Sequence, residues 1–415
     1  MSGERVSQAV IIGGGPAGSA AAAVLAEAGI QTVLLERENF PRFHIGESLM
    51  TESYWTFERI GLLERLKASD FPRKYSVQFV SENGKPSRPF YFYESNPHES
   101  SVTWQVDRAE LDAMLIDNAR AKGAEVVTGV KVERVLFDGT KASGVCGTGA
   151  DGEEIEFRAQ VVVDATGLQS LLSRQLGIMR KDPKLDKAAV YAHFEGGRRD
   201  SGIDEGATVI LHTKGNRGWF WYIPLSRNRA SVGVVGSAGE LIKGRGKPEK
   251  VLEDEIAACP AVKERLATAS RISPVHVTSD YTWRSTHCAG DGYVILGDAF
   301  GFIDPIYSSG VHLALKSGEL AADAIVEAFK VGDLSGERLG TFGEKLAGGM
   351  EALRKLVYAF YTPGFSFANF VSQHPEHRPK LVQLLIGDVF REPIRDIFEA
   401  IGEMCDLPDE MPLGK

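Results

Sequence analysis

A glycine-rich turn near the start of the chain carries the clearest chemical signal in the sequence. Residues 13–18 read Gly-Gly-Gly-Pro-Ala-Gly and fit the pattern G-x-G-x-x-G. The first glycine of this pattern permits a tight turn, the second lets the backbone approach a pyrophosphate, and the third lets a helix pack on a strand. The N–H groups and dipole of the following helix favour anions. We therefore predict a dinucleotide site at Gly13, Gly15, Pro16, Ala17 and Gly18.

An acidic residue follows at the distance that such a site requires. Glu36 closes the apolar run Gln31–Leu35, about 20 residues beyond the glycines, where a carboxylate can bind a ribose hydroxyl. A glycine-rich turn without a ligand is the alternative, but it does not explain why strand, helix, second strand and acid occur in register. The pattern alone does not distinguish FAD from NAD.

Two tryptophans occupy alternate positions of the segment 218–224, which reads GWFWYIP. Alternate residues of a strand share a face, so Trp219 and Trp221 are expected on one side and Phe220 and Tyr222 on the other. Two indoles in register would form an aromatic wall. Packing in an ordinary hydrophobic core is the alternative, because aromatic residues often fill such cores.

Four segments together resemble the large family of FAD-dependent monooxygenases, prenyl reductases and flavin-dependent halogenases. They are GGGPAGSAAA with Glu36 and Arg37, QVDRAELDAML at 105–115, VVVDATG at 161–167 and YVILGDAFGFID at 293–304. The resemblance covers most of the chain and implies that the cofactor is FAD. It also implies an α/β fold, in which a Rossmann-like FAD-binding domain is joined to an antiparallel-sheet substrate domain and C-terminal helices.

The same resemblance assigns further residues to the flavin. Arg108 would contact the flavin side of the pyrophosphate, and Asp298 would approach the ribityl chain. Arg42 and Ser48, in the segment PRFHIGES, match a region close to the flavin. Structural roles are the alternatives, because Asp107 could cap the helix that begins at Arg108, Asp298 could cap a helix, and PRFHIGES could be a solvated loop.

Three segments resemble the halogenase branch of this family. GWFWYIP fits its W-x-W-x-I-P motif, FPRKYSVQF at 71–79 resembles the segment that carries its essential lysine, and DPIYSSGVHL at 304–313 resembles D-P-[LIV]-[FE]-S-[ST]-G-V. The resemblance implies that the indole wall keeps the organic substrate from the flavin, and that Lys74 holds hypohalous acid or forms a haloamine. An ordinary surface lysine is the alternative, with Arg73 as a rival cation.

The third of these segments also suggests an anion site. Backbone N–H groups of Ser309 and Gly310 would bind chloride or bromide, with Gly310 and Val311 also close to the flavin. A simple helix cap is the alternative. Tyr307 is a candidate catalytic residue without an assigned role, because tryptophan halogenases carry glutamate there and the carrier-protein and phenol types carry phenylalanine. Without that carboxylate, a phenol or pyrrole is expected rather than an indole.

We therefore expect an FAD-dependent oxidoreductase of the halogenase type. It would use reduced FAD, O2 and chloride or bromide to halogenate a phenol or pyrrole, either free or tethered to a carrier protein. The segment 233–236 lacks the spacing of a second dinucleotide site, so NAD(P)H would dock transiently or act indirectly through a partner flavin reductase. Three alternatives stay open: an aromatic hydroxylase, a prenyl reductase and a flavin-binding regulator without activity.

This chemistry requires elements that bring distant segments together. The run Ala9–Ile12, the Ala-rich stretch that follows and the run Gln31–Leu35 predict a strand, a helix and a parallel strand. Apolar runs at 160–165 and 292–296 predict returning strands of the same sheet. β-type composition predicts a second, largely antiparallel sheet from the stretches 77–80, 90–93, 188–194, 207–212, 219–225 and 230–235. Helical periodicity begins near Val311 and continues around 336–360 and 378–402.

These elements predict three regions in the chain of 415 residues. The FAD-binding domain would comprise 1–72, 106–185 and 286–333, the substrate domain 73–105 and 186–285, and the helical region 334–415. With 43% hydrophobic and 25% charged residues, the composition is that of a globular protein with two or three domains.

Charge and cysteine content exclude several other classes of function. A net charge of −9 without a long run of Lys and Arg argues against nucleic-acid binding. The four scattered cysteines indicate neither a disulfide framework nor a zinc site, and no third ligand accompanies His374 and His377, so no metal is expected. Because the first apolar run is too short for a signal peptide or a membrane span, a cytoplasmic protein without an integral membrane segment is expected.

Overall fold

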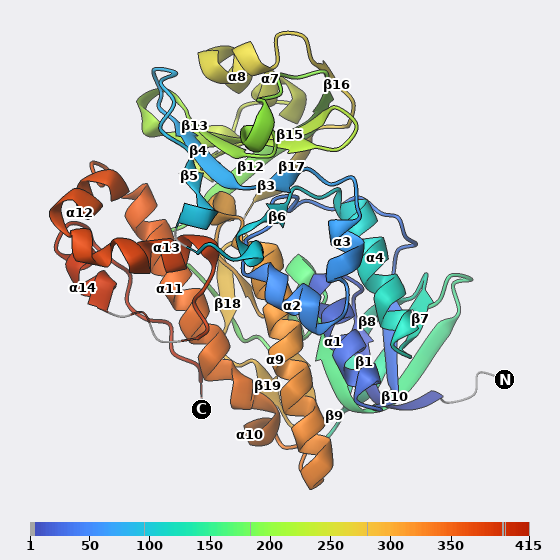
Figure 1. Ribbon diagram of the computed structural model, residues 1–415. Helices are drawn as coiled ribbons and strands as arrows, with labels where there is room; N and C mark the ends of the chain where they lie inside the picture. Colours follow the sequence, from blue (N-terminus) through green and yellow to red (C-terminus); the bar gives the residue numbers. More distant parts are fainter. Residues whose placement is uncertain are drawn as a thin grey trace.

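The structure is a computed structural model that describes residues 5–94, 96–182, 184–279, 281–391, 394 and 396–414. It has the expected α/β fold, with two large sheets and a C-terminal group of helices (Figure 1). In Figure 1 the first sheet lies at the lower right and the second sheet at the top, while the last helices of the chain, in darker orange and red, lie at the left and the lighter orange helices before them at the centre. Within the described residues, no helix combines the length and the apolar composition needed to span a membrane.

The first sheet contains the parallel strands predicted around the glycine turn. Its main strand order is β19-β20-β10-β1-β2-β7. The parallel strands are β1 (Arg5–Ile12), β2 (Thr32–Glu36), β7 (Glu125–Thr128), β10 (Glu154–Asp164) and β20 (Tyr293–Ile295). Residues 9–12 pair with both β2 and β10 and are buried, which explains their unbroken apolar character. The predicted βαβ unit and both returning strands are confirmed.

Helix α1 (Pro16–Glu27) begins directly at the glycine turn. Gly13 has a φ of 102°, which favours glycine, and a Cβ atom there would lie 2.4 Å from the Ala165 carbonyl oxygen. A Cβ atom at Gly18 would lie 2.0 Å from the Gly13 carbonyl oxygen. Gly18 therefore lets the first turn of α1 pack tightly against the end of β1.

A hairpin of two strands in the first sheet was not predicted. Strands β8 (Lys131–Asp138) and β9 (Lys141–Thr148) pair with each other, and β9 pairs antiparallel with β10. The pairing of β8 with β9 shifts register between Val132 and Arg134 and again between Leu136 and Phe137. Such irregularities interrupt the two-residue alternation by which a strand is identified in sequence.

The second sheet has the main strand order β16-β12-β15-β14-β13-β4-β5. Its main strands are β4 (Ser76–Val80), β12 (Lys187–Glu195), β13 (Thr208–His212), β14 (Gly218–Leu225) and β15 (Arg229–Ser237). It is largely antiparallel as predicted, although β4 and β13 pair in parallel. The predicted strand at 90–93 is shorter, because β5 covers only Phe90–Tyr91 and a 3-10 helix occupies Phe92–Glu94.

The C-terminal helices are more divided than their periodicity suggested. They are α9 (Ser309–Val331), α10 (Gly336–Leu339), α11 (Gly343–Tyr361), α12 (Phe367–Gln373), α13 (Arg378–Ile386) and α14 (Asp396–Gly402). The helical pattern expected around 378–402 is present as α13 and α14, and α13 ends at Ile386 because Gly387, with a φ of 92°, caps it in the left-handed region. The helix expected around 336–360 is likewise interrupted, by a 3-10 turn at Gly340–Phe342.

Shorter elements connect these layers. The helices are α2 (Ser53–Arg59), α3 (Leu63–Lys67), α4 (Arg108–Ala121), α5 (Leu171–Gln175), α6 (Ala238–Leu241), α7 (Pro248–Ala258) and α8 (Pro260–Arg265). The strands are β3 (Arg73–Lys74), β6 (Thr103–Trp104), β11 (Met179–Lys181), β16 (Ser270–Arg271), β17 (His276–Ser279), β18 (Trp283–Ser285), β19 (Ala289–Gly290) and β21 (Gly301–Phe302).

A buried ionic network fixes α11 to the rest of the molecule. Arg354 donates from Nε and Nη2 to Glu351 Oε2 at 3.0 and 2.8 Å, and from Nη1 to Asp182 Oδ2 at 2.9 Å. Arg284 of β18 donates to Glu351 Oε1 at 2.9 Å, and Tyr358 donates to Asp182. Because these buried charges are mutually paired, they hold the second half of α11 in one position.

Candidate functional site

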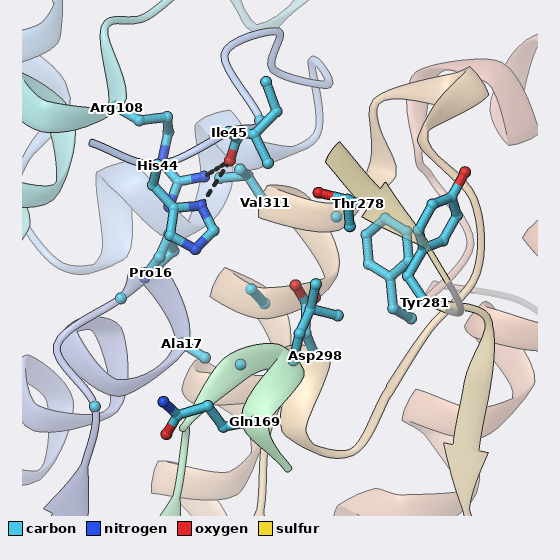
Figure 2. Close-up of a pocket in the computed structure, with 18 of the residues that line it drawn as sticks. Pro16, Ala17, His44, Ile45, Arg108, Gln169, Thr278, Tyr281, Asp298 and Val311 are labelled. Atoms are coloured by element: carbon cyan, nitrogen blue, oxygen red, sulfur yellow. Dashed lines mark hydrogen bonds between the residues drawn. The ribbon is translucent and has the colours of Figure 1, made fainter. Parts of the chain in front are cut away.

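A large cavity of about 310 Å³ lies between the first sheet and the second sheet. Figure 2 shows Pro16 and Ala17 of α1, Arg108 of α4, Asp298, Val311 of α9 and Tyr281 around this cavity. Most of the residues predicted to bind the cofactor line it: Gly13, Gly15, Pro16, Ala17, Glu36, Arg37, Arg42, Ser48, Arg108, Asp298, Gly310 and Val311. Gly18 instead packs against Gly13, so its place in the motif is structural.

The N-terminus of α1 opens onto the cavity beside Glu36. Gly15 is the N-cap residue, and Pro16 occupies the first helical position. Glu36 Oε2 accepts a hydrogen bond from Gly14 N at 2.8 Å, and Oε1 accepts one from Glu38 N at 3.0 Å. The Glu36 carboxylate is therefore held against the glycine turn. At the adjacent N-terminus of α1, the helix dipole and the free N–H groups favour a phosphate.

Two arginines share a buried carboxylate that sequence analysis missed. Arg108 donates from Nε and Nη2 to the two carboxylate oxygens of Asp112 at 2.9 and 3.0 Å, and from Nη1 to the Ile45 carbonyl at 2.5 Å. Arg42 Nη1 lies 3.2 Å from Asp112 Oδ2. Asp112 is fully buried, and its i, i+4 spacing from Arg108 on α4 is the signal that could have identified it. The helix cap given as the alternative role of this segment is also present, because Asp107 accepts a hydrogen bond from Ala109 N at 2.9 Å at the start of α4.

Burial changes the acidity of Asp298, which lines the cavity. It raises the pKa of Asp298 to about 7, although the nearby Arg108 acts in the opposite direction. His44 also lines the cavity but is exposed, and its Nδ1 donates to the Ile45 carbonyl at 2.8 Å (Figure 2). Arg37 has a side chain that is 49% exposed and lies 3.6 Å from Glu38, at the rim.

The paired indoles of β14 lie on the face that was predicted. Trp219 and Trp221 line the large cavity with ring centroids 6.1 Å apart, whereas Phe220 and Tyr222 pack in the separate core on the other face of the sheet. Both indole N–H groups are satisfied, because Trp221 Nε1 donates to Ser231 Oγ at 3.0 Å and Trp219 Nε1 has a partner on α11. The two indoles thus form a fixed aromatic wall of the cavity.

Trp219 is anchored through a relay of buried groups. Trp219 Nε1 donates to Tyr361 Oη at 2.9 Å, and Tyr361 Oη donates to Asp304 Oδ2 at 3.1 Å. Burial raises the pKa of Asp304 to about 7 and raises the pKa of Tyr361 well above its ordinary value. Tyr361 and Asp304 are 57 residues apart in sequence, so no local pattern could have paired them.

Replacement of Tyr361 by phenylalanine is expected to destabilise the protein by about 1–3 kcal/mol, because Trp219 and Asp304 would each lose a buried hydrogen-bond partner. Thermal or denaturant unfolding measures this loss. Ser231→Ala is the matched control, since it removes only the acceptor of Trp221 and should cost less. Equal stability of Tyr361→Phe and the wild-type protein would contradict the relay.

Lys74 lies in a second, smaller cavity of about 40 Å³, together with Tyr307. The apolar lining comprises Met50, Val77, Phe79, Phe90, Phe92, Ile306 and Leu385. Lys74 is 2% exposed, and its Nζ donates to Ser48 Oγ at 2.9 Å and to the Leu49 carbonyl at 3.0 Å. Burial alone lowers the pKa of Lys74 to about 7. Arg73 is exposed and donates to Lys67 O, so Lys74 is the buried basic residue of this segment.

The start of α9 borders both cavities. Ser308 lines both, with a φ of 57°, and Gly310 lines the large one. Ser309 is buried as the first residue of the helix, and it is not among the residues that line either cavity. Tyr307 donates from its hydroxyl to the Leu356 carbonyl at 3.2 Å, so it bridges this segment to α11. Its pKa is raised well above the ordinary value by burial.

Within the described ranges, no group of histidine, cysteine and acidic side chains is arranged to hold a metal ion. His374 and His377 instead stack on Phe370, with ring centroids 5.2 and 6.1 Å away. All four cysteines are buried and unpaired.

Comparison with known proteins identifies relatives over nearly the full chain. Residues 6–344 match the family described as FAD binding domain. The chain is 30% identical to a 1H-pyrrole-2-carbonyl-[peptidyl-carrier protein] chlorinase of Pseudomonas fluorescens, covering 97% of this chain and 94% of the relative. It is 31% identical to a 1H-pyrrole-2-carbonyl-[peptidyl-carrier protein] brominase of Pseudoalteromonas luteoviolacea, covering 94% of each. The structure of the flavin-dependent brominase Bmp2 superposes with a TM-score of 0.85 at 30% identity, covering 96% of this chain and 99% of Bmp2.

Proposed function

The chain belongs to the flavin-dependent halogenases, which are FAD-dependent oxidoreductases, and from this premise we propose that it halogenates a pyrrole or phenol ring presented by a carrier protein. The single observation that carries the proposal is a buried lysine in an aromatic-lined cavity that shares Thr208 and Ser308 with the large cavity. The two relatives named for pyrrole-2-carbonyl carrier proteins support the choice of ring and carrier.

The residues of the large cavity fit FAD. The N-terminus of α1 and the cations Arg42 and Arg108 suit the pyrophosphate, Glu36 suits a ribose hydroxyl, and Asp298 suits the ribityl chain. When bound in its reduced form, FAD supplies with O2 the oxidising power that converts chloride or bromide to hypohalous acid. We propose that a separate flavin reductase delivers the reduced cofactor, with NAD(P)H as the electron source.

The remaining steps depend on side chains of this chain. The N-terminus of α9 at Gly310 would hold the halide through backbone N–H groups, and the indoles Trp219 and Trp221 would keep the ring of the substrate out of the large cavity. Neutral Lys74 would attack the halogen of hypohalous acid, so that an N–halogen bond forms as the O–halogen bond breaks. The hydroxide that is released then takes a proton from the amine nitrogen and becomes water. The aromatic ring then attacks the halogen, the N–halogen bond breaks, and the proton that the ring loses returns to the nitrogen, which restores the amine of Lys74.

The surroundings of Lys74 support a neutral amine that forms a haloamine, in place of a charged ammonium that only holds hypohalous acid. Its Nζ donates to the Ser48 hydroxyl and the Leu49 carbonyl and lies 5.6 Å from the centroid of the Phe92 ring, and no charged group shifts its pKa, which desolvation alone lowers. A neutral amine carries the lone pair that the attack requires. Tyr307 replaces the carboxylate that would stabilise a cationic indole intermediate, so a phenol or pyrrole, which activates its own ring, remains the favoured substrate.

Halogenation is expected to rise with pH through about 7, because the pKa of Lys74 is lowered to about 7 and only the neutral amine reacts. Single-turnover product formation, measured between about pH 6 and about pH 8 with prereduced FAD, tests this dependence. A rate that falls across the same range would show that the ammonium form is the active one.

The proposed function is tested by supplying the protein with FAD, a flavin reductase, NADH, O2 and bromide. The candidate substrates are pyrrole-2-carbonyl and hydroxybenzoyl groups, offered as carrier-protein thioesters and as free acids, and mass spectrometry identifies the products. A brominated ring is the expected result. A hydroxylated ring formed without bromide would instead identify an aromatic hydroxylase and reject the proposal.

A further inference from the structure

A chain of buried hydrogen bonds connects Lys74 to the large cavity. Lys74 Nζ donates to Ser48 Oγ at 2.9 Å, and Ser48 Oγ lies 2.9 Å from Thr208 Oγ1. Gln105 Nε2 donates to Thr208 Oγ1 at 2.8 Å and to the Gly206 carbonyl at 2.9 Å. The side chains of all four linked residues are at most 4% exposed.

The backbone holds these four side chains in place. Ser48 and Gln105 face each other in an isolated antiparallel bridge, and Lys74 lies in β3, which pairs with β6 just before Gln105. Thr208 is the first residue of β13. The Gln105 amide cannot be reversed, because its nitrogen must face the Gly206 carbonyl, which only accepts hydrogen bonds.

Thr208 lies at the boundary between the two cavities. Together with Ser48 it lines the large cavity, and together with Lys74 it lines the small one. Among the residues that line these two cavities, Thr208 and Ser308 are common to both, so a small molecule that passes between them there lies beside the Thr208 side chain. Hypohalous acid is such a molecule, since its oxygen accepts hydrogen bonds and its halogen is the electrophilic end.

The hydroxyl groups of Ser48 and Thr208 have one more hydrogen than their mutual hydrogen bond requires. Ser48 and Thr208 possess two hydroxyl hydrogens, and their mutual bond uses one of them. When Lys74 donates to Ser48, and Ser48 donates to Thr208, both lone pairs of Thr208 are occupied by Ser48 and Gln105. The hydrogen of Thr208 is then free to point into the passage.

We propose that Thr208, oriented by Gln105 and paired with Ser48, is a positioning residue that directs hypohalous acid from the large cavity to the amine of Lys74. The spare hydroxyl hydrogen binds the oxygen of hypohalous acid, which leaves the halogen facing the amine. The inference rests on the proposed function, because it assigns Lys74 as the acceptor of the halogen.

Thr208→Val removes the hydroxyl and keeps the branched shape, whereas Thr208→Ser keeps the hydroxyl. With FAD, reductase, NADH, O2 and bromide, Thr208→Val should form brominated product about tenfold to a hundredfold more slowly, with NADH consumption unchanged. The missing oxidant should appear as free hypobromous acid, trapped by a β-diketone in solution. Thr208→Ser should restore the product and suppress the leak.

A second measurement does not require halogenation. Carbamylation of Lys74 by cyanate, followed across pH by peptide mass spectrometry, reports the midpoint at which the amine becomes neutral. Thr208→Val should lower this midpoint, because the Ser48 hydrogen loses Thr208 as acceptor and turns to the amine lone pair. Thr103→Val is the matched control, since Thr103 faces Lys74 across β3 and β6 but its hydroxyl bonds the Met50 carbonyl.

The two possible failures are distinguishable. If the wild-type protein forms neither brominated product nor free hypobromous acid, the proposed function fails, and with it the directing role of Thr208. If the wild-type protein brominates its substrate, but Thr208→Val matches it in product, leak and carbamylation midpoint, the proposed function stands and the inference about Thr208 is wrong.

Discussion

Replacement of Lys74 by alanine is expected to lower the rate of ring halogenation by about 10³-fold or more, because no other described side chain that lines the small cavity carries an amine. NADH consumption should change far less than product formation, since Lys74 does not line the large cavity and reaches it only through its hydrogen bond to Ser48. Quantitative mass spectrometry of the product, alongside NADH consumption, measures the two effects separately.

Arg73→Ala is the matched control for Lys74→Ala. Arg73 is the adjacent cation in β3, but its side chain is exposed and donates to the Lys67 carbonyl outside the cavity. This control should retain nearly full activity. Equal product from Lys74→Ala and Arg73→Ala would show that the buried amine takes no part in halogen transfer.

Replacement of Arg108 by methionine is expected to lower the free energy of unfolding by about 1–3 kcal/mol, because the fully buried Asp112 would lose its bidentate partner and keep only Arg42, whose Nη1 lies 3.2 Å away. FAD affinity should fall as well, since the cation that suits the pyrophosphate is removed. Denaturant unfolding and flavin fluorescence titration measure the two consequences.

A double variant separates stability from cofactor binding. In Arg108→Met with Asp112→Leu, no carboxylate is left buried beside the apolar side chain, so most of the stability should return. FAD binding should stay weak. Recovery of flavin affinity in the double variant would show that Arg108 serves only to neutralise Asp112.

Local patterns were sufficient for the elements that form a regular motif. The run Ala9–Ile12 is buried by two neighbouring strands, so its apolar character identified it as a central strand. The strict alternation of GWFWYIP likewise placed Trp219 and Trp221 on one face. Where registers shift, as in β8, the two-residue alternation failed because the irregularity changes which residues face the core.

Several members of the site could not be predicted because distant contacts create them. Asp112 has a local signal in its spacing from Arg108, but Tyr361 meets Trp219 from 142 residues away. Thr208 meets Ser48 across 160 residues and Gln105 across 103. Such hydrogen bonds depend on how the two sheets and α11 pack together, and this packing cannot be predicted from any single segment of the sequence.

The order of strands in the first sheet has a consequence for biosynthesis. Strand β10 pairs with β20, joining Val162 to Tyr293, and α1 packs against α9, which ends at Val331. A nascent chain therefore exposes the apolar edge of β10 and one face of α1 until most of the polypeptide has left the ribosome. Contacts so distant in sequence form slowly and leave surfaces open to aggregation. Supply of flavin and chaperones during expression should therefore govern how much of this enzyme reaches its native state.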